Sequence, residues 1–148
     1  MAARGGAFPD TEDELRGLPG LGAYTAAAVA AIAFGQRAVV VDANVERVVS
    51  RLFAIDEPLP AARKAIRQSA DTITPDVRAG DFAQAMMDLG ATICTARNPR
   101  CLLCPLTASC RAVRPRYLET HRHVPPRPWR KPADCARGHN SQAPPMRP

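Results

Sequence analysis

The apolar residues of the first 93 positions recur mostly at helical spacing. After Asp42 they follow the i, i+3, i+4, i+7, i+8 pattern of an amphipathic helix, at Val45, Val48, Val49, Leu52 and Phe53. The polar residues between them are expected to face solvent: Glu46, Arg47, Ser50 and Arg51. We therefore predict a helix over residues 43–54, with Asp42 as its N-cap.

Two helices are predicted before this one. Thr11 and Glu14 have the spacing of a capping box, which predicts a short helix over residues 12–17. Residues 23–34 are apolar nearly all round, so they predict a helix that is buried on most sides.

Two more helices are predicted after it. Pro60 suits the first position of a helix over residues 60–73. Asp81 is expected to cap the last helix, whose inward residues are Phe82, Ala85, Met86, Leu89 and Ile93. The β-branched run at 39–41 is short and has no partner strand, so we predict an extended link there and an all-α fold.

Charge divides the chain near residue 113. Residues 1–110 hold 11 basic and 12 acidic residues, whereas residues 111–148 hold 9 and 2, so the net charge of +6 belongs to the tail. The tail is also rich in proline, and we expect a partial domain over 1–113 followed by a disordered Pro/Arg-rich tail over 114–148. No secretory signal or apolar stretch of membrane-spanning length is visible, which favours a cytoplasmic protein without membrane contact. We also expect a monomer.

Four cysteines follow the last predicted helix with the spacing C-x6-C-x2-C-x5-C, at Cys94, Cys101, Cys104 and Cys110. In a reducing compartment such a cluster binds metal more often than it forms disulfides. Structural zinc sites usually pair two close-spaced Cys-x2-4-Cys knuckles, and only one such pair is present here. The spacing therefore favours a [4Fe–4S] cluster over zinc or chance clustering, and Cys135 in the tail is expected to be a free thiol.

The pentapeptide Leu18-Pro-Gly-Leu-Gly22 lies between two predicted helices and is typical of a helix-hairpin-helix motif. Its backbone N–H groups, followed by a helix N-terminus, can bind a phosphate without a basic side chain. A plain Pro-Gly turn is the alternative for the pentapeptide alone. Similarly, a lone Asp42 is more often a structural N-cap than a catalytic group.

Four motifs in order resemble the helix-hairpin-helix DNA glycosylase superfamily: residues 18–28, Val41-Asp-Ala-Asn-Val45, Gln84-Ala-Met-Met-Asp-Leu-Gly-Ala91 and the cysteine loop. The third motif is similar to the adenine DNA glycosylase (MutY) family, and the likeness covers about residues 8–112. Endonuclease III-type relatives carry a Schiff-base lysine where this chain has Tyr24, and a phenol cannot form an imine. The resemblance thus implies a monofunctional, hydrolytic glycosylase.

The resemblance also implies roles for single residues. Asp42 would stabilise positive charge on the sugar, while Tyr24 and Asn44 would orient Asp42 or the attacking water. The hairpin at Leu18, Gly20 and Gly22 would bind a DNA phosphate, and Arg97 and Arg100 would contact the DNA backbone. The four cysteines would hold a [4Fe–4S] cluster with a structural role.

The implied partner is double-stranded DNA that contains adenine opposite 8-oxoguanine or guanine. Family members carry further helices before this segment and a Nudix-like C-terminal domain, so we expect a half-barrel fragment with partly uncovered apolar helices and at best feeble activity. Two other function classes are open. One is a non-catalytic iron–sulfur DNA-binding module, and the other is a small iron–sulfur electron carrier.

Overall fold

The computed structural model describes residues 8–113, and these residues form α-helices and short 3-10 turns without a strand. The helices are α1 (Glu12–Arg16), α2 (Ala23–Phe34), α3 (Ala43–Phe53), α4 (Arg63–Ile73) and α5 (Ala79–Thr92), followed by η2 (Cys101–Leu103) and η3 (Arg111–Val113). The all-α prediction is confirmed. No helix within residues 8–113 is long and apolar enough to cross a membrane. The predicted tail over 114–148 and Cys135 lie outside the described residues.

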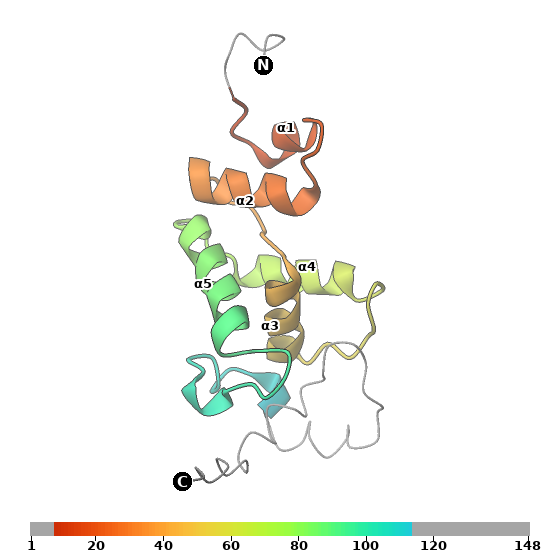
Figure 1. The fold of residues 1–148 in the computed structure, drawn as a ribbon, viewed down its shortest axis with the longest axis vertical. Helices are drawn as coiled ribbons and strands as arrows, with labels where there is room; N and C mark the ends of the chain where they lie inside the picture. The colour runs from red at the N-terminus through yellow and green to blue at the C-terminus, as the bar shows by residue number, and fades with distance from the viewer. Residues whose placement is uncertain (1–7, 114–148) are drawn as a thin grey trace, which may run out of the picture.

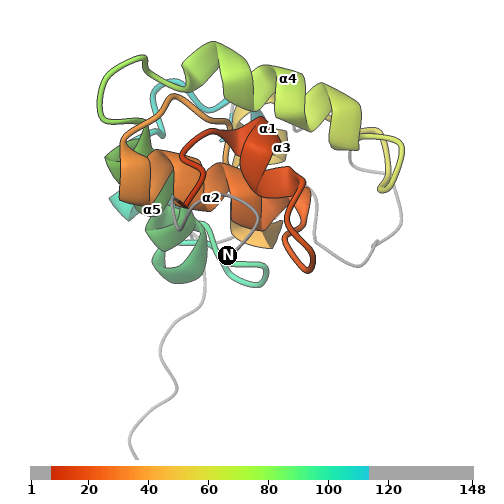
Figure 2. The ribbon, with the colours of Figure 1, turned by 90° about the horizontal axis from the view of Figure 1, so that it is seen from above.

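The helices form two layers with separate apolar clusters (Figure 1). At one end α1 packs on α2, where Leu15 and the alanines Ala26, Ala27, Ala30 and Ala31 are buried. Figure 2 shows α1 lying over α2, with α4 along one side of the molecule. In the second cluster α3, α4 and α5 enclose Val45, Val49, Ile66 and Met86, and the cysteine loop closes the far end.

Helix α5 joins the two layers through two glycines. A Cβ atom at Gly80 would lie 2.4 Å from the carbonyl oxygen of Ala31 in α2. A Cβ atom at Gly90 would lie 2.6 Å from Cβ of Asn44 in α3. Because real Cβ atoms do not approach this closely, α5 needs glycine at both helix crossings.

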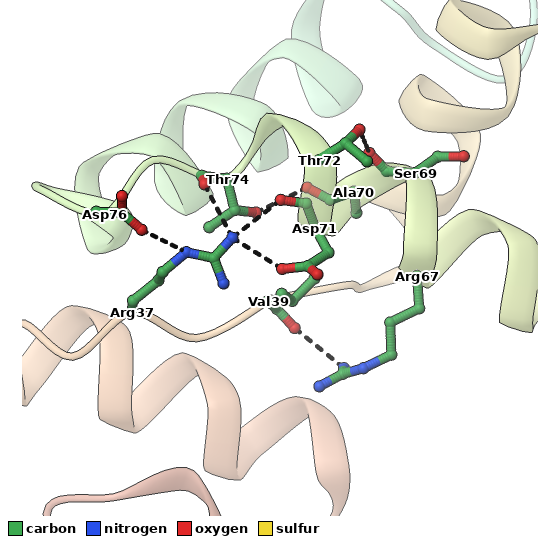
Figure 3. A network of polar contacts seen from close by, with 9 residues as sticks. All are labelled: Arg37, Val39, Arg67, Ser69, Ala70, Asp71, Thr72, Thr74 and Asp76. Atoms are coloured by element: carbon green, nitrogen blue, oxygen red, sulfur yellow. Dashed lines mark hydrogen bonds and ion pairs between the residues drawn. The ribbon is translucent and has the colours of Figure 1, made fainter.

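Arg37 fixes the extended link between α2 and α3 (Figure 3). Its Nη2 donates to the carbonyl oxygens of Asp71 (3.0 Å) and Thr74 (3.3 Å), and its guanidinium pairs with the Asp71 and Asp76 carboxylates at 2.8 and 3.0 Å. Asp71 lies in the last turn of α4 and Thr74 is its C-cap, so Arg37 binds carbonyl oxygens at the C-terminal end of the helix. The link that leads to Asp42 is thereby held against the end of α4.

Arg67 of α4 holds the same link from a second point. Its Nη1 donates to the carbonyl oxygen of Val39 at 3.1 Å (Figure 3), and its Nη2 pairs with Glu12 of α1 at 2.9 Å. One side chain thus connects α4, the link and α1. The layers are joined by polar contacts as well as by α5.

Two predicted helix starts are wrong. Helix α4 begins at Arg63 rather than at Pro60, because residues 58–63 form turns in which Ala62 N–H donates to Pro58 O (3.1 Å) and Arg63 N–H to Pro60 O (3.2 Å). The N-cap of α5 is Arg78, whose φ of 61° marks a left-handed break. Asp81 lies within the first turn and accepts from Arg78 Nε at 2.6 Å.

The prediction that Ser50 and Arg51 face solvent is also wrong, because each is only 1% exposed. Ser50 Oγ donates back to Glu46 O at 2.6 Å, which satisfies the hydroxyl within the helix. The Arg51 guanidinium points into backbone carbonyls of the cysteine loop. Helix α3 is therefore covered on a second side by a loop some 45 residues later in the chain, as the bond from Arg51 to Ala96 illustrates.

Helix α2 is buried on one side only. Ile32 and Phe34 are 45% and 40% exposed, and the ring of Phe34 stacks on Phe8 with centroids 6.3 Å apart. The prediction of burial on most sides is thus wrong for the last turns of the helix. On α5, Ala85 is likewise exposed instead of inward.

Candidate active site and four-cysteine loop

The hairpin between α1 and α2 presents exposed backbone. Gly20 has a φ of 84°, which favours glycine, and Leu21 N–H closes the turn onto Leu18 O at 3.3 Å. A Cβ atom at Gly20 or Gly22 would meet no atom within 4 Å, so both glycines face open space. Helix α2 starts after Gly22 without a capping side chain or an acidic residue in its first turn. The N–H groups of its first turn have no acceptor within the helix and can therefore bind an anion.

Asp42 is the N-cap of α3, as predicted. Its Oδ1 accepts from Val45 N–H at 2.7 Å, and its Oδ2 accepts from Asn44 Nδ2 at 3.1 Å. The carboxylate is therefore fixed by two donors, one from the backbone and one from a side chain. Since each carboxylate oxygen has more than one lone pair, both oxygens can accept a further contact.

Arg47 continues this contact chain toward the cysteine loop. Its Nη2 donates to Asn44 Oδ1 (2.8 Å) and to Gly90 O (2.6 Å), and its Nε donates to Cys94 O (2.8 Å). Burial, followed by the charge of Arg51, lowers the pKa of Arg47, while Cys94 and Asp42 act in the opposite direction. A hydrogen-bonded path thus runs from Cys94 through Arg47 and Asn44 to Asp42.

Arg51 lies one turn further along α3 and binds the same loop. Its Nη1 lies 3.3 Å from Cys94 Sγ and 2.7 Å from Thr95 O, and Cys110 Sγ lies 3.5 Å from the carbonyl oxygen of Arg51. Two of the four cysteines therefore contact this residue. A buried guanidinium beside Cys94 Sγ is suited to a thiolate or to a negatively charged cluster.

The cysteine loop runs from Ile93 to Val113 as a series of short turns. Cys94 is buried in the core, and the other three cysteines are half-buried. No group of three or more Cys, His, Asp or Glu side chains within residues 8–113 is arranged to hold a single ion. Four half-buried or buried thiols with a cationic neighbour remain a suitable donor set for an iron–sulfur cluster, in which each thiolate binds its own iron.

Tyr24 projects from the first turn of α2 toward α5. Its hydroxyl lies 3.6 Å from Met87 Sδ, and the side chain is 44% exposed. Among the described residues no hydrogen bond joins this hydroxyl to Asp42 or Asn44. The structure thus brings Asp42 and Asn44 into contact but leaves Tyr24 apart from them.

Arg97 and Arg100 lie between the first two cysteines. Both side chains are exposed, and within residues 8–113 neither forms an ion pair. Their backbone is ordered by the turn, since Arg100 N–H donates to Ile93 O at 2.9 Å and Thr95 Oγ1 donates to Arg97 O at 2.8 Å. The two charges are therefore held on the loop surface, and no acidic side chain of the described segment pairs with them.

Arg47 and Arg51 are the residues that the sequence analysis missed. Their spacing of four residues on α3 places them on one face, and that face meets the cysteine loop. A useful signal was available: two arginines lie four residues apart, on one face of the helix that begins at the Asp42 N-cap.

Two parts of the sequence match known family models. Residues 4–32 match the helix-hairpin-helix motif, and residues 94–110 match the iron–sulfur binding domain of endonuclease III. The first match contains the exposed hairpin and most of α2, and the second contains all four cysteines. The cysteine loop is thus of an iron–sulfur-binding type.

Known glycosylases match about two thirds or more of this chain. The adenine DNA glycosylase of Mycolicibacterium smegmatis is 48% identical over 99 residues, which are 67% of this chain and 34% of that protein. The thymine/uracil-DNA glycosylase of Methanothermobacter thermautotrophicus is 40% identical over 107 residues, which are 72% of this chain and 48% of that protein. The chain belongs to the helix-hairpin-helix DNA glycosylases. It spans less than half the length of either relative.

Solved structures of helix-hairpin-helix DNA glycosylases share the fold. A thermostable thymine-DNA glycosylase matches with a TM-score of 0.66 and 38% identity over 78% of this chain and 52% of that chain. Endonuclease III in a non-covalent DNA complex matches with a TM-score of 0.58 and 35% identity over 72% of this chain and 49% of that chain. The helical arrangement of residues 8–113 is thus that of about half a glycosylase of this family.

Proposed function

We propose that this chain carries the Asp42 half of a DNA glycosylase that hydrolyses the N-glycosidic bond of adenine mispaired with 8-oxoguanine or guanine. The supporting observation is the fixed Asp42 carboxylate, which is held by Val45 N–H and by Asn44 while it stays half-buried rather than sealed in the core. The 48% identity to an adenine DNA glycosylase supports adenine as the base.

The chemistry follows from the charge that develops on the sugar. Cleavage of a purine glycosidic bond leaves an oxocarbenium-like ring, and a carboxylate held beside it stabilises that positive charge. Asp42 would act in this way, and the amide of Asn44 would keep its carboxylate oriented. The adenine would first have to be turned out of the duplex into a pocket.

Tyr24 supports a monofunctional enzyme. A bifunctional glycosylase attacks the sugar with an amine to form an imine, and the phenol of Tyr24 cannot do so. Its exposed position at the start of α2, in contact with Met87, leaves its hydroxyl open to solvent or substrate. The attacking group would then be water.

DNA would be bound through two surfaces. The hairpin at Leu18, Gly20 and Gly22 would bind a DNA backbone phosphate at the start of α2, with the N–H groups of Gly20 and Gly22 donating to its oxygens. Arg97 and Arg100 would add charge contacts from the cysteine loop. Neither surface reads a base, so both would position the duplex rather than select the mismatch.

Cys94, Cys101, Cys104 and Cys110 would hold the cluster, which we assign as [4Fe–4S]. Four thiolates are the usual ligand set of that cluster, and it would supply a structural link within the loop. The residues of α3 would then transmit the loop position to Asp42 through Arg47 and Asn44.

The base specificity is tested with a panel of duplexes that contain A:8-oxoguanine, A:G, T:G or U:G pairs. The reactions are run as single turnovers with the protein in excess over the DNA, because this arrangement detects slow base release. We expect release of free adenine from the first two duplexes and no covalent product with borohydride. Release of thymine or uracil would overturn the adenine assignment. Salt-dependent DNA binding without release of any base would instead indicate a DNA-binding module.

A further inference from the structure

The second half of the cysteine loop is built from backbone turns that repeat every third residue. Cys104 N–H donates to Cys101 O (3.2 Å), Thr107 N–H to Cys104 O (3.1 Å) and Cys110 N–H to Thr107 O (3.2 Å). The C-x2-C and C-x5-C spacings therefore correspond to one turn and two turns. The turns thus join residues 101, 104, 107 and 110. Three of these four positions are cysteines, and the fourth is Thr107.

The side chain of Thr107 reaches back over both preceding turns. Its hydroxyl oxygen lies 2.5 Å from Cys101 O and 2.7 Å from Cys104 O. A hydroxyl carries one proton, so the two carbonyl oxygens share one donor. Together with the two backbone bonds, Thr107 is hydrogen-bonded to three of the four cysteines.

No other threonine in the described residues has this arrangement. Thr95, in the first half of the loop, donates to Arg97 O at 2.8 Å and contacts no cysteine carbonyl. Thr92 and Thr72 each donate to a carbonyl within their own helix, at 2.7 Å. These residues make the same kind of side-chain bond as Thr107 without joining two cysteines.

We propose that Thr107 is a positioning residue that holds Cys101, Cys104 and Cys110 in place for the iron–sulfur cluster. The inference rests on the proposed function only in its assignment of the cysteines as cluster ligands. Between Cys101 and Cys110 the loop has a single turn of 3-10 helix, η2, and its cysteines are only half-buried. Little packing therefore fixes the three thiols, and a side chain that ties their backbone together reduces the entropy lost when they bind iron.

The test compares Thr107→Val, which removes the hydroxyl at similar size, with Thr107→Ser, which retains it. Thr95→Val and Thr92→Val are matched controls, because each removes one hydroxyl bonded to a carbonyl elsewhere. The full 148-residue chain is loaded with iron and sulfide without oxygen and then exposed to an iron chelator. The rate of iron loss is followed by the absorbance of the chelate.

We expect Thr107→Val to lose iron about two to ten times faster than the unchanged chain, the range for one hydrogen bond. Thr107→Ser and both controls should lose iron at the unchanged rate. The proposal is overturned if Thr107→Val and the unchanged chain lose iron equally fast, or if Thr95→Val accelerates the loss as much as Thr107→Val.

Amide hydrogen exchange in the iron-free chain gives a second readout that needs no cluster. The N–H groups of Cys104 and Cys110 should exchange about two to ten times faster in Thr107→Val than in Thr107→Ser. Equal exchange in the two variants contradicts the proposal. If the chain takes up no iron at all, the cofactor assignment fails, while the exchange rates still decide the role of Thr107.

Discussion

The guanidinium of Arg51 lies 3.3 Å from the sulfur of Cys94, in a part of the core where the arginine is 1% exposed. The same side chain donates to Thr95 O at 2.7 Å. The helix that begins at Asp42 and the loop that carries the cysteines are therefore one packed unit. A shift of the cysteine loop would therefore act on α3 through the buried guanidinium of Arg51 as well as through apolar contacts.

Arg51→Met should strongly destabilise the folded chain. The substitution leaves carbonyl oxygens of the loop buried without their donor and removes the positive charge beside Cys94 Sγ. A buried carbonyl oxygen left without its donor costs about 1 to 3 kcal/mol. Urea unfolding, with iron content measured in parallel, checks both effects.

Arg63→Met is the matched control for Arg51→Met. Arg63 is 67% exposed and lies 3.5 Å from Glu46, and an exposed pair of this kind contributes at most about 1 kcal/mol. If the two variants lose the same stability, the buried contacts of Arg51 are not what holds the loop.

Arg47→Met should slow base release while DNA affinity is retained. Arg47 Nη2 donates to Asn44 Oδ1, and this bond fixes which end of the Asn44 amide faces Asp42. Without it the amide can turn its oxygen toward the carboxylate, which removes a donor worth about 1 to 3 kcal/mol. Single-turnover rates and DNA dissociation constants separate the two effects. An unchanged rate would show that Asn44 is oriented by other contacts.

Arg97→Ala and Arg100→Ala should weaken DNA binding in a salt-dependent way. The slope of log K against log salt is negative, and each lost phosphate contact reduces its magnitude by about 0.9. The slope should therefore be less steep by nearly 2 in the double variant. Arg78→Ala is the control, because Arg78 is 78% exposed outside the loop and pairs with Asp81. A slope that changes equally in the control would argue against a DNA contact at the cysteine loop.

Ala54→Gly should stabilise the chain by about 0.5 to 1 kcal/mol. Ala54 ends α3 with a φ of 56°, a left-handed conformation in which a Cβ atom is unfavourable. The exposed Ala85 lies inside α5, and Ala85→Gly should instead destabilise by about 1 kcal/mol. Thermal unfolding of both variants checks the contrast, and a loss of stability in Ala54→Gly would refute it.

Local signals in the sequence were sufficient for the elements that carry Asp42 and the hairpin. The apolar period after Asp42, and the Pro-Gly-Leu-Gly sequence before Ala23, predicted α3 with its N-cap and the start of α2. These features depend on residues that are only a few positions apart, so the order of residues along the chain is enough to predict them.

The burial of Arg51 could not be predicted in this way. A polar residue on the outer face of an amphipathic pattern is read as solvent-exposed, and here a distant loop covers that face. The start of α5 was missed for a related reason. Arg78 adopts a positive φ that its residue type does not signal, so the better N-cap residue, Asp81, lies inside the helix.

The central claim concerns Asp42, and Asp42→Asn tests it most directly. Asparagine caps a helix as well as aspartate does and can still accept from Val45 N–H, so folding should be retained. The negative charge is lost, and the single-turnover rate of adenine release from an A:8-oxoguanine duplex should fall by about a hundredfold to a thousandfold with DNA binding kept. Equal rates of release by Asp42→Asn and the unchanged chain would contradict the account.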